Sequence, residues 1–370
     1  MKVLKLFVVL FVLFVTLISA AGPVSAAKRD KAYDQRDPTV VYNPYRDEYI
    51  LIWTETHDNR GTDLYTKLLF TNGLPKGGFY GPSFRITREA GDDVDPAITF
   101  NPRRNEYMMV WSAYRDQTNG WDIYGQLIRT NGLPKGRPFP IYVGPGDQTH
   151  PAVGFNGHRE DFVVVWTDDR NPDTGRDIFG QTLFTSGLPH RSEAFPVHVA
   201  PGDQIDPVIA PNGDRFLVLW TEDYPGDRDI RAKLLFSAGL PIGGPEGGDW
   251  GFAGGPGNQE APALAPTTSV AVWQSDANAA ETGLDLYGVN LFPNGLPRGQ
   301  RSGITRADAN QSDPAIAYNP RRDEFIVVWV DDRNETDDIY AILVRQNGLP
   351  KGWDYPLIRD GCTGVIACRG

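Results

Sequence analysis

One pattern recurs six times along this chain, and it limits the possible folds more than any other feature. Each copy carries an X-Pro pair, a tryptophan, an Asp before a usually aromatic segment, and a Gly-Leu-Pro turn. Successive tryptophans lie 53 to 58 residues apart. They are Trp53, Trp111, Trp166, Trp220, Trp273 and Trp329. Such a period indicates a repeat architecture built from one supersecondary unit, and recurrence in every copy assigns these tryptophans to the core.

Each copy is typical of four short strands. In the second copy, an Asn-Pro turn separates 97–100 from an apolar run over 106–111. The alternating segment 123–128 and a Gly-containing hairpin turn then lead to 139–142. No helical apolar period appears beyond the first 26 residues. The sequence therefore predicts an all-β, six-bladed β-propeller of four-stranded antiparallel blades. The expected blades are about 37–90, 91–146, 147–202, 203–257, 258–307 and 308–360.

The motifs of the sixth copy also resemble a known family. Asp332-Arg333 and Asp338-Ile339-Tyr340 are similar to the second half of the PD40 (WD40-like) repeats in TolB-like six-bladed propellers. Asn319-Pro320 matches the first half loosely, because the Ser-Pro-Asp-Gly turn is missing. The resemblance covers 37 to about 358 and implies a fold, not an activity. The chain lacks the N-terminal α/β domain of TolB, so a TolB-specific role is not implied.

The two ends of the chain carry their own signals. Residues 1–26 combine two lysines, an apolar run and a small-residue site at Ala26, which predicts a secretory signal peptide. An exported propeller over 27–370 follows, secreted, periplasmic or at the cell surface, with no membrane span after cleavage; retention of the segment as an anchor is the alternative. In the tail 361–370, Cys362 and Cys368 are expected to pair. The pair either limits fraying or latches the ring against residues 28–36.

Composition and charge narrow the partners. The formal net charge is -11 and only two cysteines are present, which argues against nucleic acid as the main partner and against a cysteine-rich metal centre. Propeller topology places the loops between second and third strands on one face, where they hold 21 acidic residues and six arginines. The opposite face is mildly basic. The acidic face is expected to attract cations or a basic partner, although turns also favour Asp.

Candidate binding residues converge at the expected channel mouth. The residue at or near the start of each innermost strand is Asp37, Asp95, His150, Asp206, Ala261 or Asp313. The five polar ones predict an asymmetric polar pocket, with His57 on the same face. A solvated loop position is the alternative for His57. Trp250 lies in an expanded Gly/Pro stretch, 243–257, and is either a partner contact or part of the fourth strand of its blade.

A calcium site is the one cofactor hypothesis. Oxygen-bearing side chains alternate through the third copy in the manner of hard-cation loops. These are Asp169, Asn171, Asp173 and Asp177. The segment departs from the EF-hand loop in lacking its sixth-position Gly and twelfth-position Glu. Turn formation is the alternative role for these residues.

No sequence motif assigns a catalytic residue. The nucleophile elbow, the His-Glu-x-x-His zinc motif and the phosphate-binding loop are all missing. The leading hypothesis is therefore a binding or scaffolding protein that recognises a protein or surface polymer through its acidic face. The alternative is a glycan-active hydrolase or lyase that uses paired carboxylates at the channel mouth. Fold alone does not decide between them.

Overall fold

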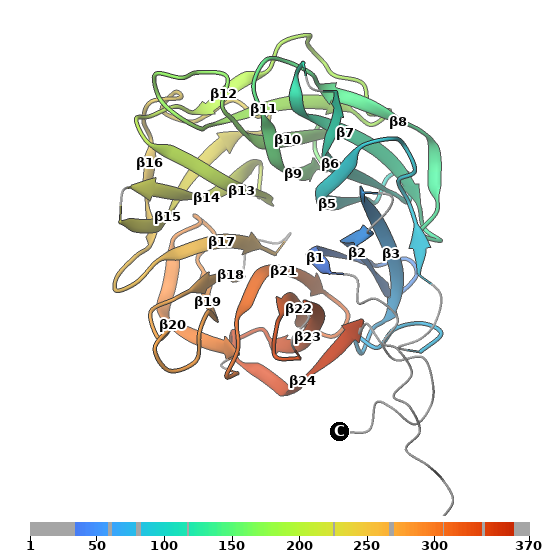
Figure 1. Cartoon of the computed structure of the whole chain (residues 1–370), viewed down its shortest axis with the longest axis vertical. Coiled ribbons are helices and arrows are strands. Elements are labelled where there is room, and N and C mark those ends of the chain that lie inside the picture. Colours follow the sequence, from blue (N-terminus) through green and yellow to red (C-terminus); the bar gives the residue numbers. More distant parts are fainter. Residues whose placement is uncertain are drawn as a thin grey trace, which may run out of the picture. The chain divides into compact units, whose positions relative to one another are not determined.

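The computed structural model describes residues 34–57, 61–78, 83–116, 118–224, 226–265, 270–305, 307–334 and 337–358. These residues form 24 strands in six four-stranded antiparallel sheets and contain no helix. The described part accordingly holds no helix with the length and apolarity needed to cross a membrane. The all-β, six-bladed propeller predicted from the repeats is confirmed. Figure 1 shows the sheets following one another around a ring.

The first three blades follow the four-strand pattern in chain order. Blade 1 contains β1 (Gln35–Asn43), β2 (Glu48–His57), β3 (Gly61–Phe70) and β4 (Phe84–Arg85). Blade 2 contains β5 (Asp92–Asn101), β6 (Glu106–Asp116), β7 (Gly120–Arg129) and β8 (Pro134–Tyr142). Blade 3 contains β9 (Gln148–Asn156), β10 (Asp161–Asp168), β11 (Asp177–Phe184) and β12 (Phe195–His198).

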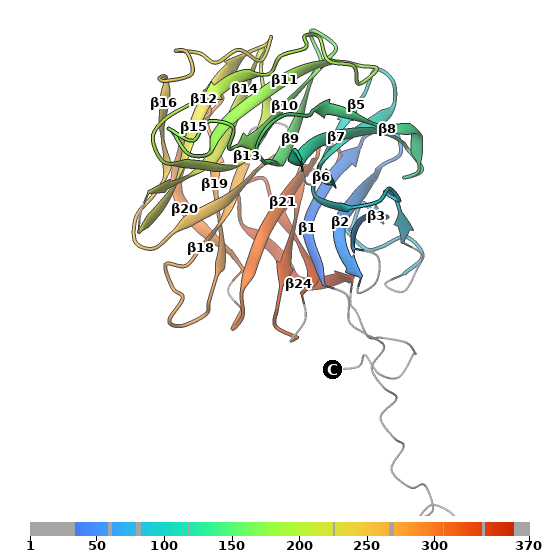
Figure 2. The ribbon, with the colours of Figure 1, turned by 45° about the horizontal axis from the view of Figure 1, so that its top comes forward.

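The last three blades repeat that order. Blade 4 contains β13 (Asp203–Asn212), β14 (Arg215–Tyr224), β15 (Asp227–Phe236) and β16 (Asp249–Ala253). Blade 5 contains β17 (Gln259–Leu264), β18 (Val270–Ser275), β19 (Asp285–Leu291) and β20 (Pro297–Thr305). Blade 6 contains β21 (Gln311–Asn319), β22 (Glu324–Asp331), β23 (Asp338–Arg345) and β24 (Pro350–Ile358). The first strand of each blade lies nearest the propeller axis (Figures 1 and 2).

The local sequence explains both the strands and their turns. The second strand of each blade is buried on both faces and is rich in β-branched and aromatic residues, as in β10, where all eight residues are buried. The turn between third and fourth strands has its glycine at positive φ, for example 83° at Gly132 and 79° at Gly348. Only glycine adopts this backbone conformation without a Cβ clash. The repeated turn therefore fixes the register of the outer hairpin.

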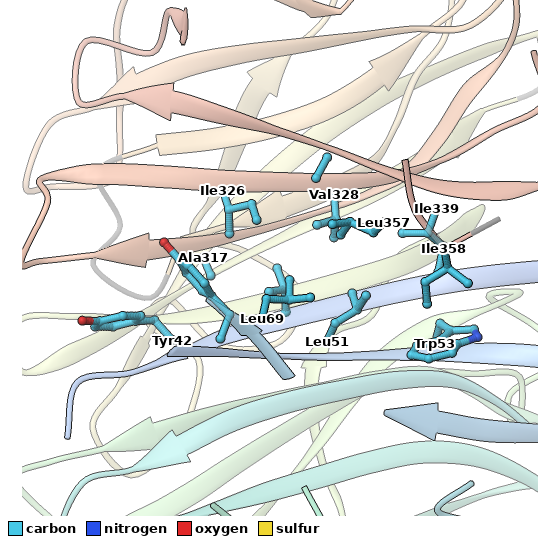
Figure 3. Packing of buried hydrophobic residues seen from close by; sticks show 13 residues of the cluster. Tyr42, Leu51, Trp53, Leu69, Ala317, Ile326, Val328, Ile339, Leu357 and Ile358 are labelled. Atoms are coloured by element: carbon cyan, nitrogen blue, oxygen red, sulfur yellow. The ribbon is translucent and has the colours of Figure 1, made fainter. Parts of the chain in front are cut away.

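The core consists of six hydrophobic clusters between neighbouring blades. The one that closes the ring joins blade 1, through Tyr42, Leu51 and Trp53, to blade 6, through Ile326 and Leu357. Figure 3 shows these side chains facing one another across the two sheets. Each sheet uses consecutive strands only, so no strand is exchanged at the closure. Apolar packing therefore connects the first and last blades as it connects the others.

Polar contacts add to this closure. Arg36 Nε lies 3.3 Å from Asp337 Oδ2, and Arg321 Nη2 donates to the Pro44 carbonyl at 2.7 Å. Tyr355 Oη donates to the Asn72 carbonyl at 3.2 Å. The predicted signal peptide, the tail and the pair Cys362 and Cys368 lie outside the described residues. Their predicted roles stay predictions.

Candidate functional site: a polar ring at the channel mouth

Six equivalent positions form a ring at the mouth of the central channel, and we call them the mouth ring. They are Asp37, Asp95, His150, Asp206, Ala261 and Asp313. Each lies in the first strand of its blade, has a φ between 48° and 53°, and falls within a register irregularity of the strand pairing. Such a bulge redirects a side chain out of the regular pleat. The blades thus share one backbone device that turns a side chain toward the axis.

Neighbouring blades hold this backbone in place. The amide of Asp95 donates to Asp37 Oδ2 at 3.4 Å, and the amide of His150 donates to Asp95 Oδ2 at 3.3 Å. Further round the ring, the Ala261 amide donates to Thr221 Oγ1 at 3.2 Å and the Asp313 amide to Gln274 Oε1 at 2.9 Å. Each of these acceptors belongs to the preceding blade. Four of the six ring positions are therefore tied to a neighbouring blade and are not independent loop residues.

His150 lies between two ring carboxylates. Its Nε2 is 3.8 Å from Asp95 Oδ1 and 3.5 Å from Asp206 Oδ1, and its side chain is 48% exposed. Burial alone would lower the pKa of His150, but the attraction of Asp95, Asp206, Asp37 and Asp313 outweighs it and raises the pKa to about 9. The imidazole is therefore protonated at neutral pH. It supplies one positive charge to a group of four carboxyl groups.

The pKa values of three ring carboxyl groups are raised as well. Burial, followed by repulsion from Asp95 and Asp313, raises the pKa of Asp37 to about 7. Burial and the charge of Asp206 raise the pKa of Asp313 to about 6, against a hydrogen bond from Ser312. The pKa of Asp206 is raised as well, mainly by burial. The mouth ring therefore exchanges protons near neutral pH, where an ordinary Asp does not.

Below the mouth ring lies a cavity of about 300 Å³. The next residue inward from each ring position is proline, and aliphatic side chains such as Val40, Ile98 and Ile316 follow. Among the described residues that line this cavity there is no Phe, Tyr, Trp, Lys or Arg. The site therefore combines acidic side chains at the mouth ring with an apolar wall. This composition is typical of small-ligand sites with few convergent polar groups.

In the structure, the residues predicted to bind calcium accept hydrogen bonds from nearby protein groups. Asp169 Oδ1 accepts the amide of Asp147 at 2.5 Å, and Asn171 Oδ1 accepts the amide of Asp173 at 3.3 Å. The buried Asp177 accepts from the Thr174 hydroxyl at 2.7 Å and from a backbone amide. Over the described ranges, no group of three or more His, Cys, Asp or Glu is placed to hold a metal ion. Asp173 lies in the turn before β11 and Asp177 begins that strand, and we do not propose a cation there.

Two other predicted binding residues lie away from the mouth ring. His57 is 7% exposed at the end of β2, where its Nε2 contacts Tyr65 Oη at 2.9 Å and Glu55 at 3.2 Å. Trp250 lies in β16, pairs with Ala232 and packs in the core cluster between blades 4 and 5. The stretch that looked like a flexible loop supplies the fourth strand of blade 4 instead. His57 is therefore buried, and Trp250 is half-buried against the core cluster.

The most exposed large hydrophobic side chain in the described part of the chain is one that the sequence did not point to. Trp353, in β24, is 91% exposed. It follows the Gly-Leu-Pro turn of blade 6 and lies in the outermost strand of that blade. The available signal was the departure from the repeat: the corresponding position is Arg137 in blade 2 and Gln300 in blade 5.

The structure buries part of the negative charge that the loops between the second and third strands carry in the sequence. Eight of their 21 acidic residues are buried: Asp63, Asp122, Asp168, Asp177, Glu222, Asp285, Asp331 and Asp338. Several of them serve the core tryptophans. In five blades the indole Nε1 donates to a carboxylate at 2.7 to 3.2 Å, and we call these acceptors the indole-capping carboxylates. They are Glu55, Asp93, Asp168, Glu222 and Asp331. A formal count therefore overstates the exposed negative charge.

Comparisons with known proteins support the fold. No family model matches the chain, and no curated protein matches it. A GH93 α-L-arabinofuranosidase of Fusarium graminearum, solved with arabinobiose, is similar with a TM-score of 0.61 and 9% identity, over 85% of this chain and 95% of that one. A Trypanosoma rangeli sialidase is similar with a TM-score of 0.54 and 9% identity, over 83% of this chain.

The extent of these matches limits what they show. The chain spans about half the length of the sialidase, since 54% of that chain is covered. At these identities the likeness is one of fold alone. The TolB-like resemblance has no matching family model, so that assignment stays a prediction. The comparisons identify this chain as a six-bladed β-propeller.

Proposed function

We propose that this protein is a binding propeller whose mouth ring takes up a cationic group, an ammonium or guanidinium, carried by a protein or a surface polymer. One observation carries the proposal. Four carboxyl groups and a single imidazole converge above a cavity of about 300 Å³, and repulsion within the group contributes to the raised pKa of Asp37 and Asp313. A cation placed among them would relieve that repulsion.

The charge balance supports a cation over an anion. His150 brings one positive charge, and its nearest carboxylates are those of Asp95 and Asp206. Asp37 and Asp313 have no described Lys or Arg among the residues lining the cavity. An acidic ligand would add to the repulsion, whereas an ammonium group would form charge-assisted hydrogen bonds. The apolar wall below suits the methylene chain that carries such a group.

This proposal narrows the wider hypothesis of an acidic binding face. Many loop carboxylates are internal, so the mouth ring is the part of that face where carboxyl groups converge without a matching number of donors. A binding role outside the cell, at a surface or in the periplasm, belongs to the same proposal through the predicted signal peptide. A protein or polysaccharide with basic groups is the expected partner.

Calorimetric titration with n-butylammonium tests the proposal, with n-butanol as a neutral ligand of the same shape. We expect the ammonium to bind more tightly as pH rises from 5.5 to 8, with release of protons from the ring. The raised pKa values give the sign, because a cation binds best to the deprotonated carboxylates. The double variant Asp37→Asn/Asp313→Asn should weaken binding by at least about tenfold.

Asp308→Asn is the matched control, because Asp308 is an exposed carboxylate on a loop of the same face. That variant should bind n-butylammonium like the unmodified protein. Equal binding of n-butanol and n-butylammonium, or an affinity independent of pH, would contradict the proposal. So would full binding by the double variant.

A second candidate is hydrolysis of a glycosidic bond. Asp37 holds its proton up to about pH 7, as a general acid must, and other ring carboxylates lie beside His150. The structural neighbours include an α-L-arabinofuranosidase and a sialidase, and the absence of Arg from the cavity lining disfavours an acidic sugar. Release of reducing sugar from a panel of neutral oligosaccharides, lost in Asp37→Asn, is the expected result for this candidate. No release from any of them would reject it.

A further inference from the structure

Six turns at one face of the propeller carry most of its exposed apolar side chains. The first strand of each blade begins at the mouth ring, and the four strands are antiparallel. The turns between third and fourth strands therefore lie at the face opposite the mouth ring, and we call them the far turns. They are 70–77, 129–136, 184–191, 236–243, 292–299 and 345–352. Ten of the fifteen exposed large apolar side chains in the described part of the chain belong to them.

Each far turn presents a pair of side chains to water. The amide of its first residue donates to the carbonyl of the leucine in Gly-Leu-Pro at 2.8 or 2.9 Å, so the two residues lie opposite each other in the hairpin. The leucine is 40–62% exposed in all six blades, and the first residue is a phenylalanine, 44–51% exposed, in four. These phenylalanines are Phe70, Phe184, Phe236 and Phe292. The face therefore repeats one small apolar patch around the ring.

Positive charge surrounds these patches. The far turns contain seven Lys or Arg and no Asp or Glu. Their three lysines pair with buried glutamates of the second strands. Their four arginines are exposed, and within the described ranges none of them forms an ion pair. The four are Arg129, Arg191, Arg298 and Arg345. In blades 2 and 6, an arginine occupies the position that phenylalanine has in the other blades.

Neighbouring blades hold some of these turns in place before any partner binds. Tyr355 Oη, in blade 6, donates to the Asn72 carbonyl in the far turn of blade 1 at 3.2 Å. Asn156 Nδ2, in blade 3, donates to the Ser237 carbonyl in the far turn of blade 4 at 2.9 Å. Because the six turns occupy equivalent positions in a ring of like blades, their tips share one level along the propeller axis. Such a preorganised surface loses little freedom on binding.

We infer that the far turns attach the protein to a lipid bilayer with anionic head groups. Phenylalanine and leucine side chains enter the boundary between head groups and acyl chains, and the arginines contact lipid phosphates. A flat bilayer meets all six turns at once. A second copy of this chain would bring the same arginines together, and their repulsion disfavours that partner. A soluble polyanion would pair with the arginines but leave the phenylalanines in water.

Sedimentation of the full chain with lipid vesicles tests the inference. One set contains equal parts phosphatidylcholine and phosphatidylglycerol, and the other contains phosphatidylcholine alone. We expect binding to the anionic set only, and added salt should weaken it by screening the arginine contacts. Phe184→Ser/Phe236→Ser/Phe292→Ser should weaken binding by at least about tenfold. Arg129→Gln/Arg345→Gln should do the same. All variants keep the same chain ends, so a terminal apolar segment cannot cause a difference between them.

Two substitutions at the face of the mouth ring are matched controls. Tyr224→Ser removes an aromatic side chain that is 50% exposed at the end of a second strand. Arg88→Gln removes an exposed arginine from the connection between blades 1 and 2. Both variants should bind anionic vesicles like the unmodified protein. Asp37→Asn/Asp313→Asn should do so as well, which separates this inference from cation binding at the mouth ring.

A tryptophan placed in a far turn reports the contact directly. Brominated phosphatidylglycerol in the vesicles should quench the fluorescence that Phe236→Trp adds and should not quench that added by Tyr224→Trp. Thermal melts check that each variant folds; if the triple serine variant does not, Phe236→Ser and the arginine pair carry the same test. Full binding by the folded phenylalanine variants, equal binding to neutral vesicles, or an unquenched Phe236→Trp would each overturn the inference. So would binding of heparin without binding of anionic vesicles.

Discussion

Carboxylates gather in two places in this propeller, largely buried beside the core indoles and half-buried in the mouth ring, and their surroundings differ. An indole-capping carboxylate such as Asp168 is fully buried and accepts from Trp166, from the Arg170 side chain and from a backbone amide. A mouth-ring carboxyl such as Asp37 has its pKa raised by burial and by the other carboxyl groups that it faces. Asp168 thus has several donors, whereas Asp37 faces like charges. Satisfied carboxylates hold the blades together, while under-satisfied ones indicate where a ligand can contribute.

Removal of an indole-capping carboxylate should have the largest effect. Asp331→Ala leaves the Trp329 indole without an acceptor and Arg333 with only Asp354 as a partner. We expect the free energy of unfolding to fall by about 3–5 kcal/mol, as for other broken buried ion pairs. Urea unfolding measures it. Ser275→Ala, at the aligned position of blade 5, is the control and should change stability by less than about 1 kcal/mol. Equal losses of stability in the two variants would mean that the indole-capping carboxylate has no special structural role.

Removal of a mouth-ring carboxyl should act in the opposite direction. Because the pKa of Asp37 rises to about 7 on folding, this group makes the protein less stable as pH increases from about 4 to 7. Asp37→Asn should therefore raise the melting temperature at pH 8 by several degrees, and the gain should shrink toward pH 4.5. Thermal melts across this range test it, with Asp308→Asn as control. Destabilisation at pH 8 would mean that Asp37 is a structural carboxylate.

Substitution of His150 should lower the stability of the protein, whereas substitution of Asp37 should raise it. Its pKa rises to about 9 on folding, so its stabilising contribution is complete below about pH 6.5 and disappears as pH passes 9. His150→Gln should be less stable than the unmodified protein at pH 6 by about 1 kcal/mol and equal to it at pH 9.5, because half of the side chain is in water. The exposed His158→Gln is the control. A loss that persists at pH 9.5 would point to packing.

The smallest effect concerns the one ring position without a charge. Ala261 has a φ of 48°, which strains any residue with a Cβ. Ala261→Gly should raise the free energy of unfolding by up to about 1 kcal/mol. Ala97→Gly, two residues after a ring position and at negative φ, should lower it by a similar amount. Urea unfolding of both variants decides whether strain at the ring is backbone strain as well as charge repulsion.

The repeat made the fold predictable to the level of individual strands. The tryptophan, the X-Pro pair and the Gly-Leu-Pro turn each occupy one structural position, so six copies define six sheets. The X-Pro pair also located the mouth ring, because its first residue is Asp37, Asp95 or its equivalent. What the sequence could not give was the bulge that turns these side chains inward, since strand register depends on pairing across the sheet.

One error of emphasis has a physical cause. The count of loop acids treated Asp168 and Asp331 as surface charge, although they lie at strand ends against an indole. For Trp250 the sequence left open a partner contact and a place in the fourth strand, and the structure places it in that strand.

The consecutive strand order within each sheet has a consequence for how such a chain is made and cut. Every sheet is complete within one stretch of about 50 residues, so a nascent chain can finish one blade before the next leaves the ribosome. Ring closure is then the last event and the only one that joins sequence-distant segments. New termini placed in the connections 86–91, 143–147, 199–202 or 254–258 would divide no sheet. Circular permutation at these loops, or the duplication of a whole blade, is therefore open to this architecture.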